Sequence, residues 1–298
     1  MCKITKNEVK MDNLFEETKF ILNKYNIKAK KSLGQNFLIN EEVVKRIVDC
    51  SEISKTDLII EVGPGIGSLT KYLLEKAGKV ISIELDEKMI KILNDRFVLY
   101  KNFELINGDI LKIDLKELIR NNKDGEKIKN VKIVANLPYY ITTPIIMKLL
   151  EEELDINTIT VMIQKEVADR LITIPGEKNT GSITYTVYYY SESEKIMEVP
   201  NTSFFPEPEV TSEVIKLNIR DKYPIDQKNK KEMFQIIKYA FMQRRKTLLN
   251  SLVNAKILKN KQQGEEMLNE LNIKVNVRPE ELKLEDFSKI TDFLRNTI

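Results

Sequence analysis

The sequence of 298 residues contains no histidine and only two cysteines, Cys2 and Cys50. Without imidazole the chain has no Ser-His-Asp triad, no histidine metal ligand and no ordinary proton shuttle near neutral pH. The two cysteines form no CxxC pair, which argues against both a disulfide framework and a thiolate zinc site. We therefore expect no bound metal, and a chemistry that works without a histidine base.

Long apolar runs are also missing, because no window of about 18 uncharged apolar residues exists. The first thirty residues carry interspersed charges and lack the apolar core and small-residue cleavage site of a signal peptide. We therefore expect a cytoplasmic protein without membrane contact. A composition of 42% hydrophobic and 31% charged residues suits one large globular domain or two smaller ones.

The net charge of +3 is small, but the charge is unevenly distributed along the chain. Basic residues are in excess in 1–40 and 201–298, whereas acidic residues are in excess in 41–200. An enzyme that binds a polyanion such as nucleic acid could show this pattern, although a random surface would often do the same. Charge alone therefore leaves the binding partner open.

Between Asp57 and Ile219 short β-branched runs alternate with longer amphipathic segments, which is typical of βαβ units and a mostly parallel sheet. The expected strands are residues 57–63, 79–86, 102–111, 131–138 and 158–165, then two late strands at 182–200 and 211–220 that would close the sheet as a hairpin-like pair. Helices are expected between the strands, for example at 68–77 and 87–97.

Two further helical regions are expected outside this pattern. Before the first strand, Asn40 is a suitable N-cap for a helix that packs on the sheet. Its apolar face would consist of Val43, Val44, Ile47 and Val48. Past Arg220 only helical patterns remain. We therefore predict an α/β domain over residues 1–220 and a smaller all-helical C-terminal domain over 221–298.

A glycine-rich turn follows the first expected strand, with Gly63, Gly65 and Gly67 allowing a sharp turn and close approach of a ligand. Glu84 ends the second strand, where a carboxylate can accept both hydroxyls of a ribose. Asp109 follows the third strand, where a side chain can accept the exocyclic amine of an adenine. Three successive strand ends of this kind favour an adenosine-containing cofactor over a plain strand–helix turn with surface acids.

NAD and S-adenosylmethionine would both satisfy these features, and the fourth strand favours the second. It ends in Asn136, Leu137, Pro138 and Tyr139 instead of a Tyr–Lys pair or a histidine suited to hydride transfer. The Asn136 side-chain oxygen and the Leu137 carbonyl could accept the N–H groups of an adenine amine and direct its lone pair at a sulfonium methyl. Pro138 would fix the backbone, and Tyr139 would stack on the base. The alternative is an ordinary turn that ends a strand.

In this order the motifs resemble the S-adenosylmethionine-dependent rRNA adenine N6,N6-dimethyltransferases of the KsgA type, from about Phe20 to Phe287. The resemblance rests on KKSLGQNFLIN, EVGPGIGSLT, IELD, NGDIL, NLPYYITTPI, QKEVADRL, FFPEPEVTSEV, FMQRRKTLLNSL and VRPEEL. It implies a Rossmann-like class I methyltransferase domain with a mostly parallel seven-stranded sheet, and S-adenosyl-L-methionine as cofactor. It also implies that two adjacent adenosines in the 3′-terminal hairpin loop of 16S rRNA, in the immature small ribosomal subunit, each receive two methyl groups. We expect the enzyme to be a monomer.

The resemblance also assigns site residues. The cofactor positions would be Asn36, Leu38, Gly63, Gly65, Glu84, Asp109 and Asn136, and the catalytic stretch would be Asn136, Leu137, Pro138 and Tyr139. Phe205 would form the second face of a stacking clamp with Tyr139, the alternative being a loop phenylalanine that packs on its own domain. Arg244, Arg245 and Lys246 would contact RNA phosphates, unless they form only a solvated helix face.

Two places depart from the family pattern. Tyr140, Ile141 and Thr142 stand where the family more often has Asn followed by smaller residues, so the rim of the pocket is expected to differ. Glu209 and Thr211 replace the usual Lys and Asp of the PxPKVDS motif, which argues against a phosphate contact from that loop. Three alternatives remain open at this point. They are a macrolide-resistance type methyltransferase that modifies a large-subunit adenine, a non-catalytic RNA-binding protein that has kept the fold, and an NAD dehydrogenase.

Overall fold

The computed structural model describes residues 13–27, 36–123, 125–243 and 245–297. Its main element is a seven-stranded sheet with the strand order β4-β3-β2-β5-β6-β9-β7. The strands are β2 (Asp57–Val62), β3 (Lys79–Glu84), β4 (Phe103–Asn107), β5 (Asn130–Asn136), β6 (Thr158–Gln164), β7 (Ser191–Val199) and β9 (Ser212–Ile219). The ladders that join β4, β3, β2, β5 and β6 are all parallel, which confirms the predicted fold class.

Helices alternate with the parallel strands, as expected for βαβ units, and further helices precede and follow this region. They are α1 (Asn13–Lys24), α2 (Glu41–Cys50), α3 (Thr70–Lys76), α4 (Glu87–Phe97), α5 (Leu115–Asn122), α6 (Thr142–Glu151), α7 (Lys165–Ile172), α8 (Ser182–Tyr190), α9 (Lys230–Ala240), α10 (Leu248–Asn254), α11 (Lys261–Glu270) and α12 (Leu284–Thr297). A separate two-stranded antiparallel sheet pairs β1 (Phe37–Leu38) with β8 (Phe204–Phe205).

Local sequence explains why α2 forms where it does. The Asn40 side-chain oxygen accepts hydrogen bonds from the N–H groups of Glu42 at 3.1 Å and Val43 at 3.3 Å, which satisfies two of the free donors at the helix start. The predicted apolar face is buried and packs in one cluster with Ile59 of β2 and Val134 of β5. The helix therefore anchors on the centre of the sheet, as predicted.

The order of the strands creates a binding edge. The chain runs from β2 through β3 to β4 and then returns to β5 on the other side of β2, so the strand order reverses at β2. In open α/β sheets, ligands bind outside the carboxyl ends of the strands at such a reversal. The registers place Glu61 of β2 beside Ser82 of β3 and Val134 of β5, and they place Glu84 beside Asn107. Acidic residues therefore reach this edge from two neighbouring strands.

The prediction of one strand over 182–200 is wrong in its first half, because residues 182–190 form α8 and only the second half forms β7. Tyr, Thr and Val favour strands in general, but tertiary burial overrides that preference. A helix turns its side chains in all directions, and nearly all those of α8 are buried. The Tyr185 hydroxyl donates to the carbonyls of Pro279 at 3.0 Å and Leu282 at 2.7 Å, so the segment packs as the core helix of its own unit.

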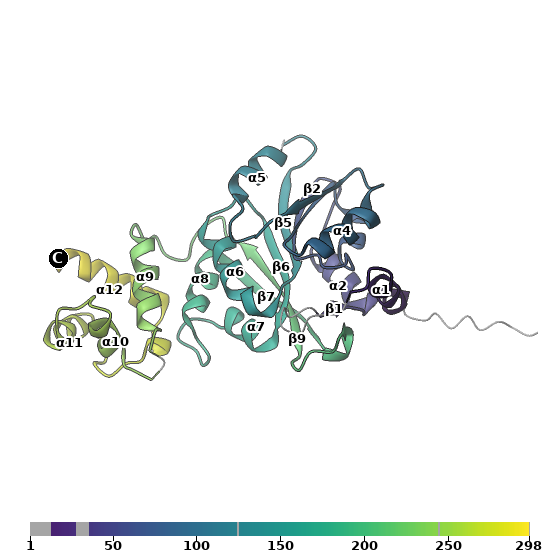
Figure 1. Ribbon diagram of the computed structural model, residues 1–298. Coiled ribbons are helices and arrows are strands. Elements are labelled where there is room, and N and C mark those ends of the chain that lie inside the picture. The colour runs from purple at the N-terminus through teal and green to yellow at the C-terminus, as the bar shows by residue number, and fades with distance from the viewer. Residues whose placement is uncertain (1–12, 28–35, 124, 244, 298) are drawn as a thin grey trace, which may run out of the picture. The chain divides into compact units, whose positions relative to one another are not determined.

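Figure 1 shows α9, α10, α11 and α12 grouped together without strands among them, as the helical pattern past Arg220 predicts. The chain divides into two compact units. The first contains the described residues up to Ile145 with Leu154–Lys165 and Ile196–Lys216, and the second contains Ile146–Glu153, Glu166–Lys195 and the described residues from Leu217 onward. The boundary between domains 1–220 and 221–298 stays a prediction. Within the described ranges, no helix is both long and apolar enough to cross a membrane.

Candidate active site

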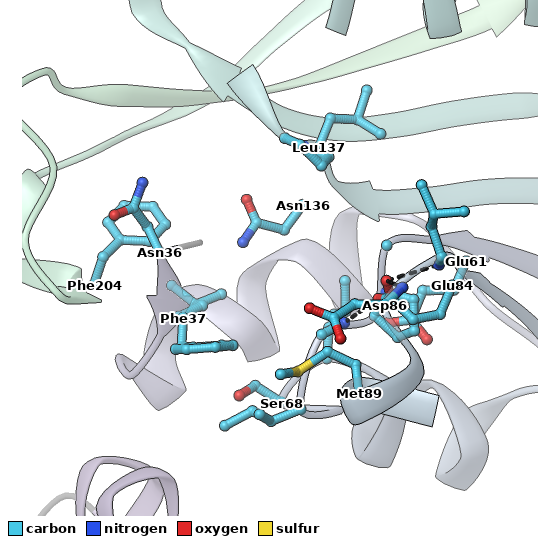
Figure 2. A pocket seen from close by; sticks show the side chains of 18 of the residues that line it. Asn36, Phe37, Glu61, Ser68, Glu84, Asp86, Met89, Asn136, Leu137 and Phe204 are labelled. Carbon is cyan, nitrogen blue, oxygen red and sulfur yellow. Dashed lines mark hydrogen bonds between the residues drawn. The ribbon is translucent and has the colours of Figure 1, made fainter. Parts of the chain in front are cut away.

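A cavity of about 460 Å³ lies at the carboxyl ends of β2, β3 and β5, within the first unit. It is lined by Asn36–Leu38, by the glycine turn after β2, by residues 84–89 and 136–140, and by Phe204. Figure 2 shows Asn136 projecting into the space between Asn36 and Phe204 on one side and Glu61 and Glu84 on the other. The cavity therefore occupies the edge that the strand order predicts for a ligand.

The glycine turn has a backbone that other residues would adopt only with strain. Gly63 has φ +66° and Gly65 has φ +59°, both in the left-handed region. A Cβ at Gly63 would meet the Pro138 ring at 3.6 Å, and one at Gly65 would meet the Phe37 ring at the same distance. The turn is thus packed between the segment that follows β5 and the segment of β1, which brings all three segments to one cavity.

Glu84 is fixed at the edge of the cavity by three backbone donors. Its Oε2 accepts from the N–H of Gly65 at 3.1 Å, and its Oε1 accepts from the N–H groups of Leu85 at 2.8 Å and Asp86 at 2.9 Å. Burial raises the pKa of the Glu84 carboxyl, while these hydrogen bonds oppose the rise. A carboxylate can accept about four hydrogen bonds, so Glu84 retains capacity for a ligand hydroxyl.

Glu61 is a second acid of the cavity, and the sequence motifs did not indicate it. Its side chain is 1% exposed, and its Oε2 accepts from the hydroxyls of Thr70 and Ser82, both at 2.7 Å. Its Oε1 has no hydrogen-bond partner in the described part of the chain. Burial raises the pKa of this carboxyl to about 7. A buried acceptor without a donor at the wall of a cavity suits a ligand that brings N–H or O–H groups.

Asn136 and Leu137 end the central strand β5 with two available acceptors. The Leu137 N–H donates to the Met162 carbonyl at 3.1 Å, so the backbone remains tied to β6 beyond the last residue of β5. The Leu137 side chain is buried, and Asn136 is half-buried. Among the described residues, none donates a hydrogen bond to the Asn136 side-chain oxygen or to the Leu137 carbonyl. Both oxygens can therefore accept from a ligand.

Pro138 and Tyr139 continue the segment with a rigid backbone and a fixed ring. Pro138 has φ −59°, the value its ring imposes. The Tyr139 hydroxyl lies 2.6 Å from the Oγ of Ser212, a buried residue of β9. Burial raises the pKa of the Tyr139 hydroxyl, while the hydrogen bond with Ser212 opposes the rise. The ring is thus held at both ends, by its backbone and by its hydroxyl.

The structure brings most of the sequence-predicted site residues together on the cavity. Those that line it are Asn36, Leu38, Gly63, Gly65, Glu84, Asn136, Leu137, Pro138 and Tyr139. Asp109 is not among the lining residues. It follows β4, its Oδ1 accepts from the Leu111 N–H at 3.0 Å, and its Oδ2 lies 3.8 Å from the Lys112 ammonium.

The two adjacent phenylalanines of β8 have different surroundings. Phe204 is buried and lines the cavity, whereas Phe205, the predicted clamp residue, is 38% exposed and does not line it. The Phe205 ring instead packs edge-on against Phe15 of α1, with the ring centroids 6.0 Å apart. The aromatic residue that β8 contributes to the cavity is therefore Phe204, one position before the predicted Phe205.

The basic cluster belongs to the second unit. Arg245 and Lys246 are exposed and lie in the turn between α9 and α10, rather than on a continuous helix. The Lys246 N–H donates to the Gln243 carbonyl at 3.0 Å within this turn. Arg244 lies outside the described residues. Arg245 and Lys246 are thus carried by a turn, and their side chains face solvent.

Comparison with known proteins gives one consistent result. The family model for ribosomal RNA adenine dimethylase matches residues 26–296. The ribosomal RNA small subunit methyltransferase A of Clostridioides difficile (strain 630) is 46% identical over 281 residues, covering 94% of this chain and 96% of the relative. That of Bacillus pumilus (strain SAFR-032) is 45% identical over 284 residues, with 94% and 96% coverage.

A solved structure agrees with these relatives. The crystal structure of a dimethyladenosine transferase from Plasmodium falciparum superposes with a TM-score of 0.70 at 27% identity, covering 87% of this chain and 98% of that one. The predicted methyltransferase activity and the predicted cofactor, S-adenosylmethionine, are confirmed by these matches. The chain belongs to the ribosomal RNA adenine dimethylase family.

Proposed function

We propose that the protein dimethylates the N6 amines of two adjacent adenosines in the 3′-terminal hairpin loop of 16S rRNA, within the immature small ribosomal subunit. The main support is that Asn136 and Leu137, each with an available acceptor oxygen, line the same cavity as the glycine turn and Glu84. The names of the relatives support the small subunit as the target. The protein would act in the cytoplasm as a monomer and contribute to ribosome biogenesis.

The cavity residues fit the cofactor in three respects. The turn at Gly63 and Gly65 lets a ligand lie against the backbone, Glu84 can accept ribose hydroxyls, and the free Oε1 of Glu61 suits a donor of the ligand. Asn36 and Leu38 would complete this wall, and Asp109 stays a predicted contact to the adenine. When bound, S-adenosylmethionine supplies an electrophilic methyl group on a sulfonium.

The other side of the cavity would activate the substrate amine. The Asn136 side-chain oxygen and the Leu137 carbonyl would accept hydrogen bonds from the two N–H groups of the adenine amine. These bonds would localise the nitrogen lone pair and direct it at the sulfonium methyl. No strong base is needed, because the amine becomes acidic once it is alkylated. This agrees with a chain that lacks histidine. Tyr139 would hold one face of the base, and Phe204 is the better candidate than Phe205 for the other.

The loop location of the target lowers the cost of presenting each adenine. Bases in a single-stranded loop are already partly unstacked, so bringing one to a pocket costs less than flipping it from a duplex. Arg245 and Lys246, together with Arg244, would contact phosphates of the RNA. Each such contact makes binding more sensitive to salt.

The test is to incubate the purified protein with methyl-labelled S-adenosylmethionine and, separately, with immature small and large ribosomal subunits. We expect label in two adjacent adenosines of the small-subunit RNA, at two methyl groups each, read by mass spectrometry of the isolated RNA fragment. Label confined to large subunits would contradict the proposal and favour the macrolide-resistance type. Absence of label from both subunits would favour a non-catalytic RNA-binding role.

A further inference from the structure

Tyr140 is an exposed aromatic residue on the lining of the cavity. Its side chain is 61% exposed, whereas the neighbouring Tyr139 is half-buried. Of the large exposed apolar residues in the described ranges, Leu85 and Tyr140 also line the cavity, and Tyr140 is the aromatic one. Single exposed apolar residues are common on protein surfaces. What distinguishes Tyr140 is its position, next to the residues that would hold the substrate base.

The backbone at Tyr140 is held firmly while its side chain extends into solvent. Tyr139–Ile141 form a 3-10 turn, in which the Ile141 N–H donates to the Pro138 carbonyl at 3.2 Å. The hydroxyl of Thr142, a buried residue, donates to the same carbonyl at 3.1 Å. Within the described residues, the Tyr140 side chain makes no hydrogen bond or ring contact. A rigid turn thus presents a free aromatic ring at the rim.

We propose that Tyr140 stacks on the base next to the adenine in the cavity and so positions the RNA for each methylation. The inference rests on the proposed function, in which the two target adenosines are adjacent. One of them is then outside the cavity while the other reacts, and a single phosphodiester links the two. Stacking on an aromatic ring tolerates any base, so the same ring can hold either neighbour as the two adenosines change places. Tyr139 would be the inner platform and Tyr140 the outer one.

The test compares Tyr140→Ala and Tyr140→Phe with the wild-type chain on unmethylated small ribosomal subunits at one salt concentration. For Tyr140→Ala we expect the KM and the Kd for these subunits to rise about 5- to 150-fold, the range that corresponds to stacking of one base. We expect a smaller change in kcat and an unchanged Kd for S-adenosylmethionine, which also shows that the variant is folded. Tyr140→Phe keeps the ring and should stay close to the wild type.

A matched control is Tyr100→Ala, which removes a partly exposed tyrosine from the loop between α4 and β4. This variant should bind small subunits as the wild type does. A wild-type KM in Tyr140→Ala would overturn the stacking role, and so would equal losses in Tyr140→Ala and Tyr140→Phe, because the hydroxyl would then be the important group. Failure of the wild type to methylate small-subunit RNA would overturn the proposed function itself, which is a distinct result.

Discussion

Replacement of Glu61 by Gln should change how the stability of the fold depends on pH. The side chain is 1% exposed, and burial raises the pKa of its carboxyl from 4.5 to about 7. The hydroxyls of Ser82 and Thr70 oppose this rise by donating to the carboxylate, and the charge of Glu84 adds to it. The folded chain therefore keeps Glu61 protonated over a pH range in which the unfolded chain has lost that proton.

The sign and the size of the effect follow from this difference. Between pH 4.5 and about 7, unfolding releases a proton from Glu61, so the free energy of unfolding falls as the pH rises. A pKa difference of about 2.5 corresponds to about 3 kcal/mol. The stabilising contribution is complete below pH 4.5 and is lost above about pH 7.

Urea unfolding from pH 4.5 to 8, without cofactor, would measure the effect at the transition that exposes the sheet. In Glu61→Gln the amide oxygen can still accept from Thr70 and Ser82, and the side chain cannot ionise. The free energy of unfolding of the variant, minus that of the wild type, should therefore increase by about 3 kcal/mol from low to high pH. A difference that stays flat over this range would refute the reasoning. Glu117→Gln, at a side chain that is 60% exposed, is the control and should show no such trend.

Three further results are expected at the cavity. Asn136→Ala should abolish methylation while binding of unmethylated small subunits remains nearly intact, as measured by label transfer and filter binding. Tyr139→Phe and Ser212→Ala each break the 2.6 Å contact between the two hydroxyls, so each should lower kcat. Their double variant should lose little more than either single one in steady-state kinetics. Glu84→Gln should raise the Kd for S-adenosylmethionine by calorimetry and should lower the stability by about 1–3 kcal/mol in thermal unfolding, because one of its backbone donors loses its acceptor.

The sheet and most of the site are predictable because their physics is local and periodic. Strands buried on both faces appear as continuous apolar runs, and β2 is buried along its whole length. Once the strands are parallel, their carboxyl ends share one edge, so Glu84 and Asn136 can be placed together from the sequence alone. The α8 segment shows where this reasoning fails. Its strand-favouring residues become helical because the surrounding core buries all sides of the helix.

The order of the strands in the sheet determines where Asp109 lies, and the periodicity of the sequence does not. Glu84 ends β3 and Asp109 follows β4 of the same sheet. Because β3 lies between β4 and the central β2, the end of β4 is farther from the point where the order reverses. The sequence motifs did not indicate Glu61 for a different reason, because this residue lies inside a strand rather than at its end. An ionisable residue within an otherwise apolar buried strand needs a partner or a shifted pKa. That requirement was the signal available in the sequence.

Phe204 and Phe205 are adjacent, so a shift of one residue along the extended segment decides which of them faces the cavity. Successive side chains of an extended segment point to opposite sides, so a shift by one position exchanges the residue that faces the cavity for the one that faces away. The sequence offers two identical side chains and therefore no hydrophobic pattern that could decide between them. The packing of Phe205 on Phe15 of α1 decides it, because that contact occupies the Phe205 ring while the buried Phe204 lines the cavity. A contact between segments that are far apart in the chain thus selects the aromatic residue of the cavity, and no local pattern carries that information.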